Sequence, residues 1–102
     1  MARFTGKIAI VTGGGSGIGR ATALLLASEG AAITVADIGA DAAHAAVAEI
    51  AAAGGNARVQ VVDVSDPAAV EEMVADTVSA FGGLDVLHNN AAALDQTAST
   101  KT

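Results

Sequence analysis

The chain has 102 residues, of which 52% are apolar and 16% are charged, and its formal net charge at pH 7 is −6. This length holds one domain at most, and the apolar content excludes disorder for the bulk of it. The absence of cysteine excludes disulfides and thiol nucleophiles. Five Lys and Arg residues cannot form the basic patch that a nucleic-acid backbone requires. The first apolar run is too short for a membrane span, so we expect a soluble cytoplasmic protein with no nucleic-acid or membrane partner.

The first half of the chain alternates short β-branched runs with alanine-rich helical stretches. Residues 7–12 predict a buried strand, and a glycine cluster over 13–19 follows it directly. Apolar residues then recur at helical spacing, and Gly30 follows in the position of a C′ glycine. A second strand is predicted over 32–37 and a second helix over 41–53.

The second half repeats this alternation. A third strand is predicted over 58–63. The next helix begins at Ser65-Asp66-Pro67, where a capping side chain precedes a proline whose missing N–H costs nothing, and it ends at Gly82. A fourth strand is predicted over 84–90. Short buried strands that alternate with helices predict an α/β fold with a parallel sheet and right-handed crossovers.

The glycine cluster over 13–19 is the strongest functional signal, because it follows a strand and opens a helix. Free N–H groups and the positive end of the helix dipole would there face a diphosphate. The glycines are spaced G-x-x-x-G-x-G, through Gly13, Gly17 and Gly19, and the cluster lacks the lysine of a P-loop. A glycine-rich turn that binds nothing is the alternative.

Three motifs in chain order resemble the short-chain dehydrogenase/reductase family: Thr12-Gly13-x-x-x-Gly17-Ile18-Gly19, Asp63-Val64 after the third strand, and Asn89-Asn90-Ala91 after the fourth. The resemblance covers residues 7–92 and departs at Ala92, where the family has glycine. It implies a Rossmann-type doubly wound parallel sheet, with strand order 3-2-1-4, and hydride transfer between a nicotinamide and an alcohol or carbonyl. Gly14 lies at a variable position of the motif, so a substitution there is expected to disturb cofactor binding and folding less than one at Gly19.

Asp37 predicts which nicotinamide cofactor is bound. It ends the second strand about 20 residues past the glycine loop, where an acid accepts hydrogen bonds from an adenosine ribose and repels a 2′-phosphate. Ser16, Ile38 and Gly39 add no basic side chain, so we expect NAD rather than NADP. An aspartate that merely caps the next helix is the alternative.

The resemblance assigns further roles at the ends of the third and fourth strands. It implies that Asp63 and Val64 contact the adenine, and that Asn90 and Ala91 lie beside the ribose near the nicotinamide. A turn aspartate and plain sheet scaffolding are the alternatives, and Asn89 is expected to brace the sheet. The predicted cofactor-binding residues are Gly13, Ser16, Gly17, Ile18, Gly19, Asp37, Ile38, Asp63, Val64, Asn90 and Ala91.

No catalytic or metal-binding residue is predicted. His44 is expected at the surface and His88 buried in the fourth strand, and neither has a partner at metal-ligand spacing. The family transfers protons with a tyrosine and a lysine four residues on, and this chain has no tyrosine.

We therefore expect a dinucleotide-binding half-domain over 1–92, followed over 93–102 by a loop or disordered tail that leads to a C-terminal half absent from this chain. As an intact protein it would be a homo-oligomeric NAD-dependent dehydrogenase with a small alcohol or carbonyl substrate, whereas residues 1–102 alone would be inactive. The alternatives are a stand-alone, non-catalytic nucleotide-binding module and a site for another adenosine compound such as S-adenosylmethionine.

Overall fold

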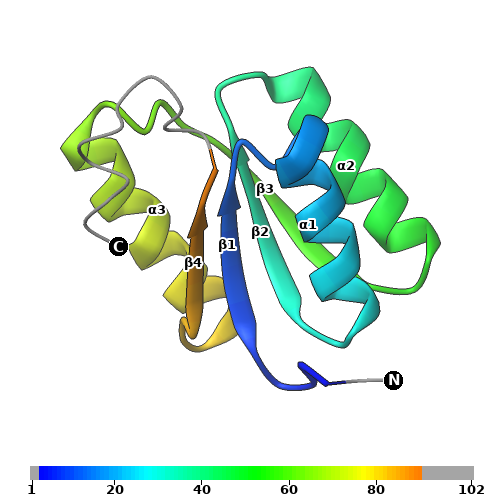
Figure 1. The fold of residues 1–102 in the computed structure, drawn as a ribbon. Coiled ribbons are helices and arrows are strands. Elements are labelled where there is room, and N and C mark those ends of the chain that lie inside the picture. The colour runs from blue at the N-terminus through cyan, green and yellow to red at the C-terminus, as the bar shows by residue number, and fades with distance from the viewer. Residues whose placement is uncertain (1–2, 91–102) are drawn as a thin grey trace.

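The computed structural model describes residues 3–90. Seven elements alternate along them: β1 (Ile8–Thr12), α1 (Gly17–Ser28), β2 (Ala32–Asp37), α2 (Ala40–Ala52), β3 (Asn56–Val61), α3 (Pro67–Phe81) and β4 (Val86–Asn89). The strands are parallel and lie in the order β3-β2-β1-β4, which confirms the predicted order. Helices α1 and α2 cover one face of the sheet and α3 the other (Figure 1).

The side chains of the two central strands alternate between two hydrophobic cores. Ala9, Val11, Ile33 and Val35 point toward α1 and α2, where they meet a layer composed mainly of alanine. Ile10 and Ala36 point the other way, toward Met73 of α3. The two cores explain why β1 and β2 are mainly apolar on both faces, with Thr12 and Thr34 as their buried polar residues.

The outer strands differ from their predicted bounds because their neighbours set where pairing stops. β3 begins at Asn56 and ends at Val61, which pair with the first and last residues of β2. β4 pairs only with residues 9–12 of β1 and is therefore shorter than predicted. As an edge strand within residues 3–90, it leaves Val86 and Leu87 39% and 42% exposed.

The helix ends confirm the predicted start and stop signals. Asp66 Oδ1 accepts a hydrogen bond of 3.0 Å from the Ala68 N–H, and Pro67 follows it at the first helical position. Gly30 follows the last turn of α1 with a φ of +101°, a conformation that favours glycine.

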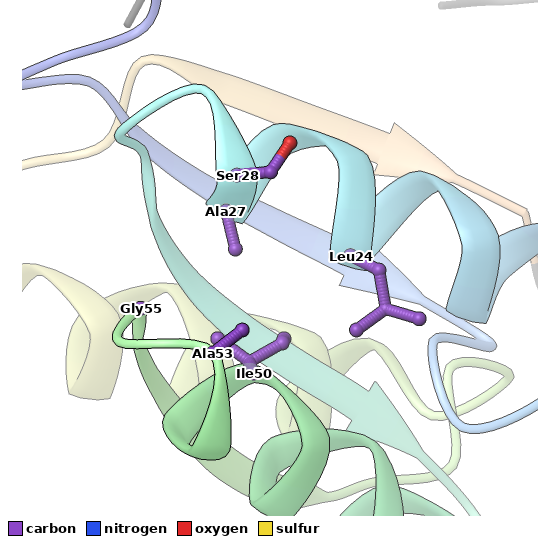
Figure 2. Close-up of a pocket in the computed structure, with 6 residues that line it drawn as sticks. All are labelled: Leu24, Ala27, Ser28, Ile50, Ala53 and Gly55. Carbon is purple, nitrogen blue, oxygen red and sulfur yellow. The ribbon is translucent and has the colours of Figure 1, made fainter.

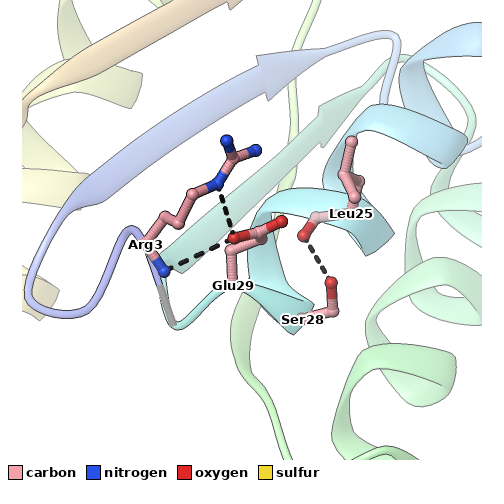
Figure 3. Close-up of polar contacts among 4 residues, drawn as sticks. All are labelled: Arg3, Leu25, Ser28 and Glu29. Carbon is pink, nitrogen blue, oxygen red and sulfur yellow. Dashed lines mark hydrogen bonds and ion pairs between the residues drawn. The ribbon is translucent and has the colours of Figure 1, made fainter. Parts of the chain in front are cut away.

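The segment before β1 is held against the end of α1 (Figure 3). Arg3 Nε donates to Glu29 Oε1 at 3.0 Å, and the Phe4 N–H donates to the Glu29 carbonyl at 2.7 Å. The hydrogen bond from Arg3 lowers the pKa of the Glu29 carboxyl. These bonds to Glu29 fix how the chain enters β1.

Candidate functional site

The described residues of the predicted site gather at one edge of the sheet. The glycine loop follows β1, Asp37 ends β2, Asp63 lies two residues past β3, and Asn90 follows β4. Because all four strands are parallel, their carboxyl ends meet at this edge. The strand order reverses between β1 and β4, which in open α/β sheets is where the adjoining loops part and ligands bind.

The glycines of the motif make turns and contacts that a side chain would prevent. Gly13 and Gly17 have φ values of +64° and +58°, in the left-handed region. A Cβ on Gly19 would overlap the carbonyl oxygen of Gly13 and lie 2.7 Å from Asn90 Nδ2. The glycine loop and Asn90 therefore face each other across the point where the strand order reverses.

Two further loop glycines, at variable positions of the motif, are also packed tightly. A Cβ on Gly14 would lie 2.9 Å from the Val11 carbonyl oxygen, and one on Gly15 would lie 2.8 Å from the backbone carbon and the Cβ of Ala42 in α2. Both distances are shorter than real Cβ contacts allow. Gly14 is thus more constrained than its place in the motif predicts, and Gly15 seats the loop against α2.

The N-terminus of α1 is open toward solvent. Ser16 is its N-cap, but the Ser16 side chain forms no capping hydrogen bond, and the first turn contains no acidic residue. Ser16, Gly17 and Ile18 are exposed. Free backbone N–H groups and an unopposed helix dipole therefore meet at a surface that an anion can reach, as a diphosphate requires.

The Asp37 carboxylate binds the glycine loop as well as its own turn. Asp37 Oδ2 accepts a hydrogen bond of 2.9 Å from the Gly15 N–H, and Asp37 Oδ1 accepts one of 2.9 Å from the Gly39 N–H. The N-cap of α2 is Gly39, and α2 has no side-chain capping bond. Asp37 therefore does not act as a helix cap, and each of its oxygens keeps a second lone pair for a ligand.

Asp63 and the apolar residues of the site lie at the same edge: Asp63 and Val64 follow β3, Ile38 follows β2, and Ile18 lies in the first turn of α1. Asp63 Oδ1 accepts hydrogen bonds from the Ser65 hydroxyl at 2.7 Å and the Ser65 N–H at 3.0 Å, which lower the pKa of the Asp63 carboxyl. Ile18 and Ile38 are 74% and 70% exposed, and Val64 is half-buried. Exposed isoleucines beside a polar loop suit the faces of a flat aromatic ring.

Thr12 holds the two sides of the site together, a role that its place in the motif did not reveal. Its hydroxyl is buried at the end of β1 and accepts from the Asn90 N–H at 2.9 Å. Its one proton is shared between Asn89 Oδ1 at 3.0 Å and the His88 carbonyl at 3.3 Å. The Asn89 amide thus ties β4 to β1, as expected. Ala91 lies outside the described residues.

The two histidines occupy different surroundings. His44 is exposed on α2, as predicted. His88 is only half-buried, so the expectation of a buried histidine is wrong, because β4 is an edge strand among the described residues. Within residues 3–90 no cluster of three or more His, Cys, Asp or Glu side chains could hold a metal ion. No helix of the same span is long and apolar enough to cross a membrane.

A small hollow lies at the opposite edge of the sheet, between the C-terminal ends of α1 and α2 (Figure 2). Its volume is about 170 Å³, and its lining is mainly apolar: Leu24, Ala27, Ser28, Ile50, Ala53 and Gly55. Ligand pockets usually have volumes of roughly 300–1,000 Å³ and a few convergent polar groups. This hollow does not meet either condition, and none of the predicted site residues lines it.

Comparison with known proteins identifies the family. The family profile described as short chain dehydrogenase matches residues 7–102, nearly the whole chain. This chain belongs to the short-chain dehydrogenase family. Two similar relatives are the cyclohexanol dehydrogenase of Acinetobacter sp. (strain SE19), 42% identical over 97% of this chain, and a 2,5-dichloro-2,5-cyclohexadiene-1,4-diol dehydrogenase of Sphingobium indicum, 51% identical over 90%.

Solved structures of short-chain dehydrogenases share the fold. A short chain dehydrogenase from Mycobacterium avium is 46% identical over 89% of this chain, with a TM-score of 0.85. A 7α-hydroxysteroid dehydrogenase complexed with NADH and 7-oxo glycochenodeoxycholic acid is 38% identical over 84%, with a TM-score of 0.82. This chain spans 39% and 36% of the two relatives, and 35% and 34% of the two solved chains. Short-chain dehydrogenases bind a nicotinamide cofactor, and the open helix terminus, the glycine contacts and Asp37 fit such a group.

Proposed function

We propose that this chain is the NAD-binding part of an oxidoreductase that transfers hydride between a nicotinamide cofactor and a small alcohol or carbonyl compound. The observation that carries the proposal is the contact between the glycine loop and the Asp37 carboxylate. There the open N-terminus of α1 and a carboxylate bonded to the Gly15 N–H at 2.9 Å lie at one edge of the sheet. One part suits a diphosphate and the other the hydroxyls of a ribose.

The charges around Asp37 favour NAD over NADP. A carboxylate repels a 2′-phosphate, and NADP sites place an arginine nearby to accommodate it. Here Arg20 is committed to Glu49, with hydrogen bonds of 2.8 and 2.6 Å. Arg58 donates to Thr34 and Gln60 instead. Within residues 3–90, Asp37 forms no ion pair with Arg or Lys that would offset its charge.

The residues of this chain would bind and orient the cofactor. The N–H groups at the start of α1 would hold the diphosphate, Asp37 would accept from the ribose, and Asp63 would accept from the adenine edge. Asn90 would place the second ribose, with Thr12 fixing its backbone at 2.9 Å. When bound, the nicotinamide supplies hydride exchange with carbon. The proton must be transferred by another group, which we place outside residues 1–102.

We extend the proposal to the substrates and assembly of the intact protein. Like the relatives, which are named as dehydrogenases of cyclic alcohols and diols, the intact enzyme would act on small alcohols or carbonyls. We expect it to be cytoplasmic and homo-oligomeric. Size-exclusion chromatography with light scattering would test the oligomeric state. A stand-alone nucleotide-binding module is the competing function.

The decisive experiment compares cofactors and then activity. NADH and NADPH are titrated into the protein and followed by nicotinamide fluorescence, and we expect NADH to bind more tightly. Tighter binding of NADPH would refute the cofactor assignment. Oxidation of a panel of alcohols is then assayed with and without a longer C-terminal segment fused to the chain. Turnover only with the fused segment supports the enzyme, and cofactor binding without turnover in either form supports the module.

A further inference from the structure

The carboxylate of Asp37 bridges two loops that are far apart in sequence. Its Oδ2 binds the Gly15 N–H in the glycine loop, 22 residues away, and its Oδ1 binds the Gly39 N–H in the turn before α2. Both distances are 2.9 Å, and the group is half-buried. The middle of the glycine loop is therefore attached to the end of β2 through this side chain.

The same part of the loop is wedged against α2. A Cβ on Gly15 would lie 2.8 Å from the carbonyl carbon and the Cβ of Ala42 and 2.9 Å from the Ala43 nitrogen. The backbone of Gly15 therefore packs directly on the first turn of α2, without room for a methyl group between them. A hydrogen bond on one side and a close backbone contact on the other define the position of the loop.

We propose that Asp37 is a positioning residue for the diphosphate, because its carboxylate and the Gly15–Ala42 contact together seat the glycine loop. The inference rests on the proposed function and deepens it. Ribose recognition and diphosphate recognition would share one side chain. A change at Asp37 would therefore alter the phosphate site as well as the choice between NAD and NADP.

The charge of Asp37 and its positioning role have opposite effects on an anion, which makes the role measurable. Replacing the carboxylate by an amide removes a negative charge near the diphosphate and should by itself strengthen anion binding. An asparagine, however, has one carbonyl oxygen for the two N–H donors of Gly15 and Gly39, and its NH₂ group would face one of them. That mismatch loosens the loop and should weaken diphosphate binding.

The test measures the affinities of ADP and adenosine by competition against NADH and compares their ratio between variants. Hydrogen bonds to the ribose contribute to both ligands and cancel, so the ratio reports the diphosphate alone. Asp37→Asn should lower the ratio about three- to tenfold, the worth of one ordinary hydrogen bond. Gly15→Ala, which keeps the carboxylate but displaces the loop, should lower it as well. Asp41→Asn, which removes an exposed charge from the first turn of α2, should not lower it.

The outcomes separate the two proposals. If the unaltered protein binds neither NADH nor ADP, the proposed function is wrong. If it binds ADP more tightly than adenosine and the ratio is higher in Asp37→Asn, only the loss of charge acts on the diphosphate and the positioning role is refuted. If the ratio is unchanged in Asp37→Asn, the two opposing effects are separated by Gly15→Ala, which keeps the charge: a lowered ratio there supports the positioning role and an unchanged ratio refutes it. Should Asp37→Asn melt below the assay temperature, Gly15→Ala decides: an unchanged ratio there refutes the seating of the loop.

Discussion

Gly19→Ala should destabilise the protein, although the substitution lies in the first turn of a helix, where alanine has a higher helix propensity than glycine. Helix propensity alone predicts a gain of at most roughly 0.5–1 kcal/mol, the value for alanine replacing glycine in a helix interior. The structure predicts the opposite sign. A Cβ on Gly19 would overlap the Gly13 carbonyl oxygen and lie 2.7 Å from Asn90 Nδ2, and neither the loop backbone nor the paired end of β4 can move freely.

The size of the loss follows from these contacts. Forcing a methyl group into packed backbone typically costs about 1–3 kcal/mol, which exceeds the gain in propensity. For a domain of this size each kcal/mol lowers the melting temperature by roughly 4–8 °C. Gly83→Ala is the matched control, because a Cβ there meets only Ile8 Cδ1 at an ordinary 3.8 Å. That variant should stay within about 0.5 kcal/mol of the unaltered protein.

Urea unfolding followed by circular dichroism measures both free energies, and a titration with NADH measures the site. Gly19→Ala should unfold at lower urea and bind NADH more weakly, and Gly19→Val should be worse in both respects. A Gly19→Ala variant as stable as Gly83→Ala, or more stable than the unaltered protein, would show that α1 does not lie against Gly13 as described. The close contacts of Gly19 with Gly13 and Asn90 would then be refuted.

Four further outcomes are expected. Asp37→Ala should narrow the preference for NADH over NADPH, measured by fluorescence titration, and an unchanged preference would place the discrimination elsewhere. The pKa of Glu29 is lowered by Arg3, so the Arg3–Glu29 pair should stabilise the fold above the ordinary pKa of 4.5, and this stabilisation should be lost as pH falls through the lowered pKa. In urea melts, Arg3→Ala should therefore be less stable than the unaltered protein near neutral pH and equally stable in acid. Thr12→Val should cost about 1–3 kcal/mol in the same melts because half-buried partners lose their hydrogen bonds, whereas Thr12→Ser should cost much less. Residues 1–102 alone should give no NAD-dependent turnover, and turnover that His88→Ala abolishes would contradict this.

Much of the fold could be predicted from local patterns in the sequence. Asp66-Pro67 and Gly30 marked helix ends because capping and a positive φ are properties of a few neighbouring residues. The bounds of β3 and β4 were less accurate, because the end of a strand depends on how far its neighbour continues. The same reason accounts for His88, whose burial depends on whether another strand covers β4.

In the predicted site, too, some features follow from local sequence and others only from tertiary structure. The spacing of Gly13, Gly17 and Gly19 and the place of Asp37 after the second strand are linear features, so the sequence alone located the glycine loop and its acidic partner. Only the tertiary structure showed that the Asp37 carboxylate also holds the loop. Nothing along the chain indicates a bond between residues 22 positions apart, since it exists only because parallel pairing brings the ends of β1 and β2 to one edge of the sheet.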